Sequence, residues 1–338
     1  MSDKRIAIVG PALKAGVIGA YLAARWAAPG QEVIIQPEAE SESDGPLLLR
    51  PDHERFHAEI GLSRAAQSGN PAFAFRVETS RGAVSLPFSP HGLTNGGVAF
   101  HHFWHRANSI TEQPDLPDFS LALALEKALA LPDLAQVSLE AGWTVQRAKY
   151  ATALLELARE NGAIISSPEE ANSAHVVIDC RINSAEPGWS DGKVTVTGCP
   201  DIPGLDWQIC ANAARRLVGL IGDAKDFESE QLEYSRLARS ELDRIDDMRE
   251  LLFAMDPFKT ERPSLKRKID LFEACGRIPT EDFEVFGQAE WLAALWERGI
   301  RPRRHDRMAN AMPEGDLLKW LSMLRKQIEQ VPMRGAAA

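Results

Sequence analysis

The chain has 338 residues and a formal net charge of −10, with 44% hydrophobic and 25% charged residues. This is the balance of an ordinary globular protein, and the length is enough for roughly two domains with buried cores. Because no extended Lys/Arg patch interrupts the negative charge, we expect neither a nucleic-acid nor an anionic-membrane partner.

The cysteines and the apolar segments indicate the compartment. Cys180, Cys199, Cys210 and Cys275 form no C-x-x-C pair, which is typical of reduced, mostly buried thiols. No stretch reaches the ~20 consecutive apolar residues that a membrane span needs, and the chain opens almost directly on a strand without a signal segment. We therefore expect a cytoplasmic α/β protein that contacts no membrane.

The sequence RIAIVGPALKAGVIGAYLAA near the N-terminus predicts a buried strand, a tight turn and a helix. This is how a dinucleotide-binding fold begins, with the helix N-terminus facing a pyrophosphate. The pattern G-x-G-x-x-G is broken, because Pro11 follows Gly10 and one residue too many precedes the next glycine. The candidate cofactor-binding residues of this turn are Gly10, Ala12, Ala15 and Gly16.

Residues 31–36, QEVIIQ, predict a second buried strand. A nucleotide-binding fold carries an acid for the ribose hydroxyls at the end of this strand, roughly 20 residues past the glycines. Glu38 is the first acid after the strand and is our candidate for this role. A solvated loop acid is an equally good interpretation of Glu38.

The remaining pattern begins with mixed elements and ends almost wholly helical, with the change near Pro200. We predict a Rossmann-like FAD/NAD(P)-binding α/β module over residues 1–200, followed by a mostly helical C-terminal module over residues 201–338. Asp118 is the expected N-cap of one helix. The predicted elements are helices at 52–62, 118–129, 147–160, 206–220 and 229–253, strands at 72–79 and 174–179, a loop at 86–99, and further helices to about residue 331.

Several segments of this chain resemble segments of the flavin-dependent tryptophan halogenase family and follow one another in the same order. Residues 98–106, VAFHHFWHR, are similar to that family's F-H-H-Y-W-x-R, and residues 55–62 are similar to its F-x-x-x-L-G-L helix. The resemblance covers most of the chain. The other matching segments are residues 5–24, 73–77, 91–92, 142–150, 176–179, 233–236, 244–247, 268–272, 286–291 and 299–302.

The resemblance implies an FAD-binding fold that receives reduced flavin from a separate reductase. In that family a lysine and a glutamate direct an oxidised halogen onto an electron-rich ring. Ala74 stands at the lysine position here, and a shift of two residues would place Arg76 there, whose guanidinium cannot act as a deprotonatable amine. Leu205 stands at the glutamate position, and the neighbouring Asp206 is expected to be a helix N-cap.

Other parts of the family's apparatus are altered as well. The flavin-contacting loop corresponds to residues 45–49, GPLLL, which are apolar, and the family's W-x-W-x-I-P motif is absent. The chain is shorter than a typical member, and the difference lies between Asp179 and Pro200. Pro11 also removes a backbone N–H from the phosphate turn. These concordant losses indicate a short, degenerate member of the family.

The histidines offer a second kind of site. His53/His57 and His101/His105 have i, i+4 spacing, which would place both rings of each pair on one helix face. No Cys, Asp or Glu stands at ligand spacing from them, so we expect no metal. The resemblance instead implies a residual pocket for an aromatic ligand, with core packing as the alternative. The candidate pocket residues are His101, Phe103 and Trp104.

Our leading hypothesis is a pseudoenzyme that keeps the halogenase fold without halogenation or tight FAD binding and acts as a binding or partner protein. The alternative is a diverged FAD-dependent halogenase or monooxygenase that acts on an indole or phenol-like substrate. The cofactor is FAD if there is any. The expected partners are a small aromatic ligand and a second copy or an active homologue in a dimer. A Ser-His-Asp hydrolase with a nucleophile elbow and a P-loop nucleotidase are not expected, because neither G-x-S-x-G nor G-x-x-x-x-G-K-[ST] occurs.

Overall fold

The computed structural model describes residues 4–38, 45–63, 68–128, 139–166, 174–181, 183, 186–222 and 227–335. The chain forms two compact units, each built from two segments. The first unit is Met1–Pro71 with Gly142–Leu242, and the second is Ala72–Ala141 with Asp243–Ala338. Residue 200, where the composition changes, lies inside the first unit. The boundary between the two predicted modules at residue 200 stays a prediction.

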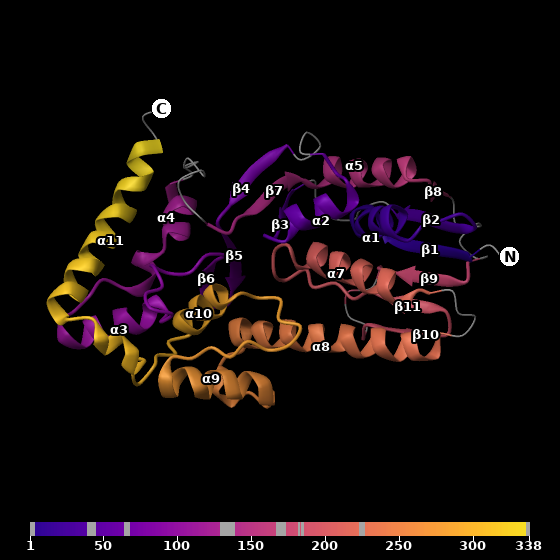
Figure 1. Cartoon of the computed structure of the whole chain (residues 1–338). Coiled ribbons are helices and arrows are strands. Elements are labelled where there is room, and N and C mark those ends of the chain that lie inside the picture. The colour runs from indigo at the N-terminus through magenta and orange to yellow at the C-terminus, as the bar shows by residue number, and fades with distance from the viewer. Residues whose placement is uncertain are drawn as a thin grey trace. The chain divides into compact units, whose positions relative to one another are not determined.

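A six-stranded sheet is the centre of the first unit (Figure 1). Its strand order is β10-β11-β9-β1-β2-β8, and β1 pairs in parallel with both β2 and β9. The two strands expected at the start of the chain are confirmed. The strands are β1 (Lys4–Pro11), β2 (Gln31–Glu38), β8 (Ile164–Ile165), β9 (Val176–Asp179), β10 (Gly188–Ser190) and β11 (Lys193–Thr195).

The middle of β1 is buried on both faces, which explains its unbroken apolar run. Ile6, Ala7, Ile8 and Val9 are all less than 10% exposed. Strands covered on both faces have no polar face and therefore do not alternate. One face is closely covered by the first helix, since a Cβ on its Gly19 would lie 2.8 Å from Cγ1 of Ile35 on β2.

In the described part of the first unit, four helices and a small second sheet accompany the central sheet. The helix predicted at 147–160 has those bounds, and its expected end at Asn161 is confirmed by the C-cap there. The second sheet has the order β3-β7-β4. The helices are α1 (Ala12–Arg25), α2 (His53–Ile60), α5 (Arg147–Glu160) and α7 (Leu205–Leu220), the strands are β3 (Pro46–Leu49), β4 (Gly69–Ala72) and β7 (Gly142–Gln146), and α8 (Glu228–Phe253) begins in this unit and ends in the second.

The second unit is mainly helical and contains one antiparallel hairpin. Helices α4 and α10 contact this hairpin, and α11 contacts α3 and α4. The elements are β5 (Ala74–Thr79), β6 (Gly82–Pro87), α3 (Phe100–Ile110), α4 (Leu121–Ala128), α9 (Pro263–Cys275), α10 (Gln288–Glu297) and α11 (Glu314–Gly335), with 3-10 turns η2 (Leu116–Phe119), η4 (Pro257–Lys259) and η5 (Arg307–Ala311).

Two predicted boundaries in this unit are wrong. The strand expected at 72–79 is two strands, since β4 ends before Phe73 and β5 begins after it. The helix expected to begin with Asp118 as its N-cap begins instead at Leu121. Asp118 lies inside η2, which is capped by the Asp115 carboxylate, and Pro117 stands at the start of this turn. The expected end of that helix at residue 129 lies outside the described residues.

One lysine of the second unit is completely buried. Lys268 of α9 donates from Nζ to Oε2 of Glu284 at 2.6 Å, and its Nζ lies 3.7 Å from the ring centroid of Trp291. The ammonium group therefore has both a carboxylate and the negative face of an indole as partners. This arrangement compensates a charge that would otherwise be very costly to bury.

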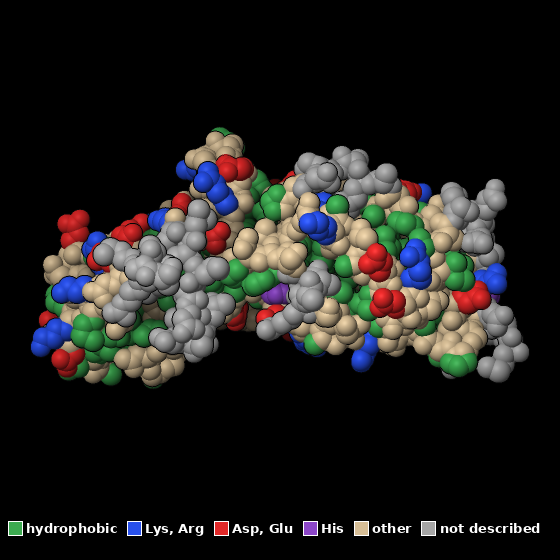
Figure 2. Space-filling model, turned by 90° about the horizontal axis from the view of Figure 1, so that it is seen from above, with side chains coloured by type: hydrophobic (Ala, Val, Ile, Leu, Met, Phe, Trp, Pro, Cys, Tyr) green, Lys and Arg blue, Asp and Glu red, His purple; other side chains and the backbone are tan. Residues whose placement is uncertain are grey.

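The surface carries both signs of charge. On the face seen in Figure 2, Lys and Arg side chains alternate with Asp and Glu side chains over the described parts of both units. Among the described residues, no helix is long and apolar enough to cross a membrane.

Candidate functional site

The carboxyl edge of the parallel sheet is where this kind of fold holds ligands, at the point where neighbouring strands connect in opposite directions. At this edge β1 continues directly into α1 through Gly10 and Pro11. A Cβ on Gly10 would lie 2.5 Å from Sγ of Cys180 and 3.1 Å from its carbonyl carbon. Gly10 is therefore required by the close approach of the residue that follows β9.

Lys14 lies in the first turn of α1 and is only 7% exposed. Its Nζ donates to Oδ1 of Asn183 at 2.6 Å and lies 3.6 Å from Oδ2 of Asp206. The other oxygen of Asp206 accepts the backbone N–H of Cys199 at 2.6 Å. A side chain on Gly198 would overlap this cluster. The first turn of α1 thus carries an ammonium group that is held by Asn183 and Asp206.

The cluster corrects the expected role of Asp206. The N-cap of α7 is Gly204, and Asp206 is the second residue of the helix. Its carboxylate balances the charge of Lys14, which the positive end of the α1 dipole alone would disfavour.

Replacing Lys14 by Met is expected to destabilise the protein by about 3 kcal/mol, because it leaves the largely buried Asp206 carboxylate without its cation. The double variant Lys14→Met/Asp206→Asn should recover at least half of this loss, since the amide oxygen can still accept the Cys199 N–H. Urea denaturation of the wild type and the two variants measures both values. Equal stabilities for the single and double variants would contradict the ion pair.

A second charged cluster lies at the ends of β9 and β2. The buried Asp179 accepts hydrogen bonds from Nε and Nη2 of Arg181 at 2.9 and 2.7 Å, and Lys193 Nζ lies 3.0 Å away. The hydrogen bonds from Arg181 hold the pKa of Asp179 well below its usual range, although burial opposes them. Nη1 of Arg181 also lies 3.7 Å from Oε1 of Glu38. The candidate ribose acid is therefore in an ion pair with Arg181.

The other predicted cofactor residues lie within α1. Ala12 is its first residue, Ala15 is completely buried, and Gly16 faces α5, where a Cβ would lie 3.3 Å from Cβ of Leu154. The small residues of this segment allow close packing of α1 against its neighbour. Their role in binding a cofactor stays a prediction.

The segment at the position of the flavin-contacting loop is a strand. Residues 46–49 form β3, which pairs antiparallel with β7 from Pro46↔Gln146 to Leu49↔Trp143. Leu47, Leu48 and Leu49 are buried. The sequence does not predict this strand, because four residues are too few for a periodic pattern.

The two residues expected at the family's catalytic positions have buried hydrocarbon side chains. Ala74 is the first residue of β5 and is 3% exposed, and Leu205 is the first residue of α7 and is fully buried. Ala74 belongs to the second unit and Leu205 to the first. Neither side chain can donate or accept a proton.

The three predicted pocket residues lie within about one turn of α3. Each of their side chains contacts another part of the protein. His101 donates from Nε2 to the Gly276 carbonyl at 2.7 Å. Phe103 packs edge-on against Trp320, with 5.3 Å between ring centroids. Trp104 donates to the Pro114 carbonyl at 2.8 Å. These contacts favour packing roles, and the role in ligand binding stays a prediction.

Histidines gather around this helix in the second unit. The rings of His101 and His102 are 4.2 Å apart, and His102 Nδ1 accepts the backbone N–H of Asp306 at 3.2 Å. Burial lowers the pKa of His91 and of His102 to about 4. Burial also lowers the pKa of His101 and His105, against hydrogen bonds to backbone carbonyls. Among the described residues, no three His, Cys, Asp or Glu side chains lie where they could share a metal ion.

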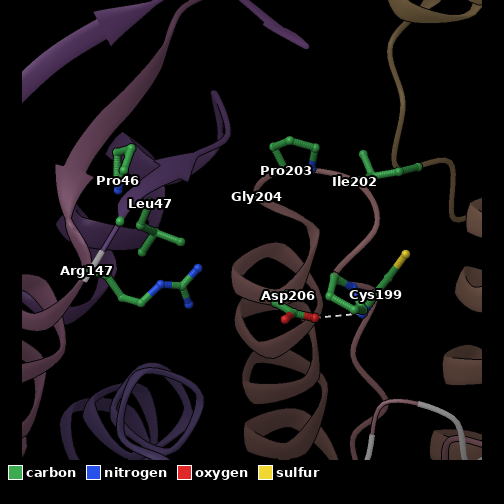
Figure 3. A pocket seen from close by; sticks show the side chains of 10 residues that line it. Pro46, Leu47, Arg147, Cys199, Ile202, Pro203, Gly204 and Asp206 are labelled. Atoms are coloured by element: carbon green, nitrogen blue, oxygen red, sulfur yellow. Dashed lines mark hydrogen bonds between the residues drawn. The ribbon is translucent and has the colours of Figure 1, made fainter. Parts of the chain in front are cut away.

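A cavity of about 340 Å³ lies beside the Lys14 cluster in the first unit (Figure 3). Asp206 belongs to both, and among the described lining residues Arg147 is the other charged one. No motif in the sequence points to a role for Lys14 or Arg147. Lys14 carries one usable signal, since a cation in the first turn of a helix opposes the helix dipole and needs a partner.

Comparison with known proteins identifies the fold. Residues 205–314 match the family described as tryptophan halogenase. No curated protein sequence matches the chain. A flavin-dependent halogenase of Xanthomonas campestris, Xcc4156, is similar in structure with a TM-score of 0.81 and 15% identity, over 99% of this chain and 96% of that one.

Two further solved structures are similar to this chain over nearly its whole length. BrvH, a flavin-dependent halogenase from Brevundimonas sp. BAL3, has a TM-score of 0.79 and 15% identity over 99% of this chain and 97% of that one. The tryptophan 6-halogenase SttH from Streptomyces toxytricini has a TM-score of 0.73 and 10% identity over 98% and 97% of the two chains. The chain thus has the fold of the flavin-dependent halogenases, and its residues 205–314 match the tryptophan halogenase family, in agreement with the resemblance of its motifs.

Proposed function

We propose that this chain is a halogenase homologue that has lost tight FAD binding and halogenation and acts as a binding protein. The observation that carries the proposal is the Lys14 cluster at the start of α1, where a dinucleotide-binding fold holds a pyrophosphate. A pyrophosphate that used this ammonium group would have to draw it away from Asn183 and Asp206. It would then face the Asp206 carboxylate, and like charges at this distance repel strongly in a buried site.

The rest of the edge does not fit FAD either. Pro11 has no N–H to offer to a phosphate, and Glu38 lies in an ion pair with Arg181, which a ribose would have to compete with. The apolar strand β3 stands at the position of the flavin-contacting loop. Several independent parts of a flavin site are therefore altered together, which supports loss of the cofactor rather than a tolerated variant.

The catalytic positions support the same proposal. Ala74 and Leu205 cannot replace an amine and a carboxylate, whose chemistry depends on holding and moving a proton. A reaction that needs both groups would therefore have no acid or base at these positions.

Flavin uptake tests the proposal. Purified protein is incubated with excess FAD, desalted, and examined for the flavin absorbance band, with a known flavoprotein carried through the same steps. We expect no stoichiometric flavin in this protein, and circular dichroism verifies that it is folded. Tight stoichiometric binding would overturn the proposal. In that case reductase-dependent turnover of an indole or a phenol becomes the experiment for the alternative, a diverged halogenase or monooxygenase.

A further inference from the structure

Helix α3 holds the segment between α10 and α11 through hydrogen bonds from its side chains to the backbone of that segment. His105 donates from Nε2 to the Pro302 carbonyl at 2.8 Å, and Arg106 donates from Nη1 to the Ala309 and Met312 carbonyls at 2.7 and 2.5 Å. All of these residues belong to the second unit. The 3-10 turn η5 and its flanks are therefore attached to α3 at several points.

His102 of α3 makes a contact that depends on the protonation of its ring. Its Nδ1 accepts the backbone N–H of Asp306 at 3.2 Å, so this nitrogen carries no proton. The residue is 5% exposed and packs against Gly276, where a Cβ would lie 2.7 Å from Cε1 of the ring. A proton on Nδ1 would convert the acceptor into a donor that faces another donor. The hydrogen bond to Asp306 therefore requires a neutral His102.

Residues 306–309, which we call the Asp306 turn, begin at this hydrogen bond. The Asp306 carboxylate accepts the Met308 N–H at 2.9 Å, and the Asp306 carbonyl accepts the Ala309 N–H at 3.0 Å. Three backbone amides, those of Asp306, Met308 and Ala309, are thus engaged in hydrogen bonds that depend on the placement of one residue. Loss of the contact with His102 frees the first of them and loosens the other two.

Four titratable side chains lie close enough to affect the charge of His102, and they have opposing effects. Burial has the largest influence and lowers the pKa of His102 to about 4. The Asp306 carboxylate raises this pKa, but it also caps η5 and lies 3.7 Å from Nη2 of Arg277, which follows α9. The nearest histidine ring is 4.2 Å away. The three neighbouring histidines, which lower the pKa, are His101 and His105 of α3 and His305 of the held segment.

We propose that the Asp306 turn is an acid-sensitive latch, closed on α3 while His102 is neutral and released when this ring takes up a proton. In the open turn the ring is hydrated and protonates near its ordinary pKa of about 6.5, so acid favours opening. The closed latch is fully stable above about pH 6.5 and is lost as the pH falls toward 4. His105 and Arg106 act as donors and keep their hydrogen bonds, so the release is local. It does not depend on whether flavin binds.

Hydrogen–deuterium exchange of the full-length protein at pH 7 and pH 5 tests the inference. Protection factors are compared, because they remove the direct effect of pH on the exchange chemistry. For the amides of the Asp306 turn we expect a decrease of about 20-fold, the change in the opening equilibrium for one histidine whose pKa moves between about 4 and about 6.5. His102→Asn should abolish most of this decrease, since its amide oxygen accepts the Asp306 N–H without titrating.

His91→Leu is the matched control. His91 precedes α3, is 3% exposed, and has a pKa that burial lowers to the same value of about 4. Its replacement should weaken the pH dependence of exchange in the buried helix α10, which opens when the unit unfolds, and leave that of the Asp306 turn unchanged.

Four results would overturn the inference. In the wild type they are a constant protection factor for the turn from pH 7 to pH 5, or equal protection of the turn and of α10, which would mean that the turn opens only when the unit unfolds. In the variants they are a decrease that persists in His102→Asn, or one that is lost in His91→Leu. The first two results do not depend on the folding of a variant.

Discussion

Lowering the pH from about 6.5 to about 4 is expected to remove about 5 kcal/mol from the free energy of unfolding, because the buried His91 and His102 stay neutral in the folded protein. Both have a folded pKa of about 4, below the unfolded value of about 6.5. Between these values the unfolded chain binds more protons than the folded one. Stability is therefore fully present above about pH 6.5 and is lost as the pH falls through this window.

The charged groups around His91 and His102 have opposing effects on the pKa values of the two rings. Asp115 raises the pKa of His91, and Asp306 raises that of His102, while neighbouring histidines lower both. The lowering of both pKa values by burial is larger than the increase caused by the carboxylates. The lowered pKa values of Asp179 and Glu59 affect stability mainly at more acidic pH, because their ordinary values lie near 4.

Urea denaturation at a series of pH values measures this loss. The double variant His91→Leu/His102→Asn should show a clearly shallower pH dependence, since Leu does not titrate and the Asn oxygen can accept the Asp306 N–H. His175→Asn is the matched control, because the exposed His175 also accepts a backbone N–H at Nδ1, from Arg5. The same slope in all three proteins would rule out His91 and His102 as its cause.

Replacing Lys268 by Met should destabilise the protein by about 3 to 5 kcal/mol, since it leaves the mostly buried Glu284 without a cation and removes the contact with Trp291. The methionine has nearly the same length, so packing is largely kept. The double variant Lys268→Met/Glu284→Gln should regain a large part of the loss, because it removes the buried charge.

Lys266→Met is the control for this experiment. Lys266 is an exposed residue of the same helix, α9, and its replacement should change stability by less than about 0.5 kcal/mol. Thermal or urea denaturation of the four proteins completes the comparison. A cost at position 268 no larger than that at position 266 would show that the ion pair contributes nothing.

The sequence predicts best the elements whose signal is local and periodic. The opening strand and helix, the helix 147–160 and the two long helices that begin near residues 206 and 229 all lie within one or two residues of their expected ends. Each contains several turns, or an unbroken apolar run, so its hydrophobic pattern repeats. Their bounds need no information from the rest of the chain.

The short strands could not be predicted in this way. β3, β10 and β11 have three or four residues each, and their pairing partners decide that they are strands. The same holds for the start of α4, where a capped 3-10 turn takes the residues that a helix pattern would include. Tertiary contacts override local preference at these places.

The sequence likewise predicts only part of the candidate site. The opening motif predicts its place at the carboxyl edge of the sheet. The hydrogen bond between Lys14 and Asn183 joins residues 169 positions apart, and no spacing in the sequence points to it. The contribution of Arg147 to a cavity likewise depends on three other segments of the chain.

The ammonium group of Lys14 can be regarded as a ligand that is attached to its own receptor. A protein that holds a diffusible cofactor gains stability in proportion to the logarithm of the cofactor concentration, and loses it when the cofactor is scarce. A tethered cation is present at a constant and high effective concentration in every molecule. On the proposed function, the stability of this fold is therefore independent of the supply of flavin, and the chain completes its folding without a second component.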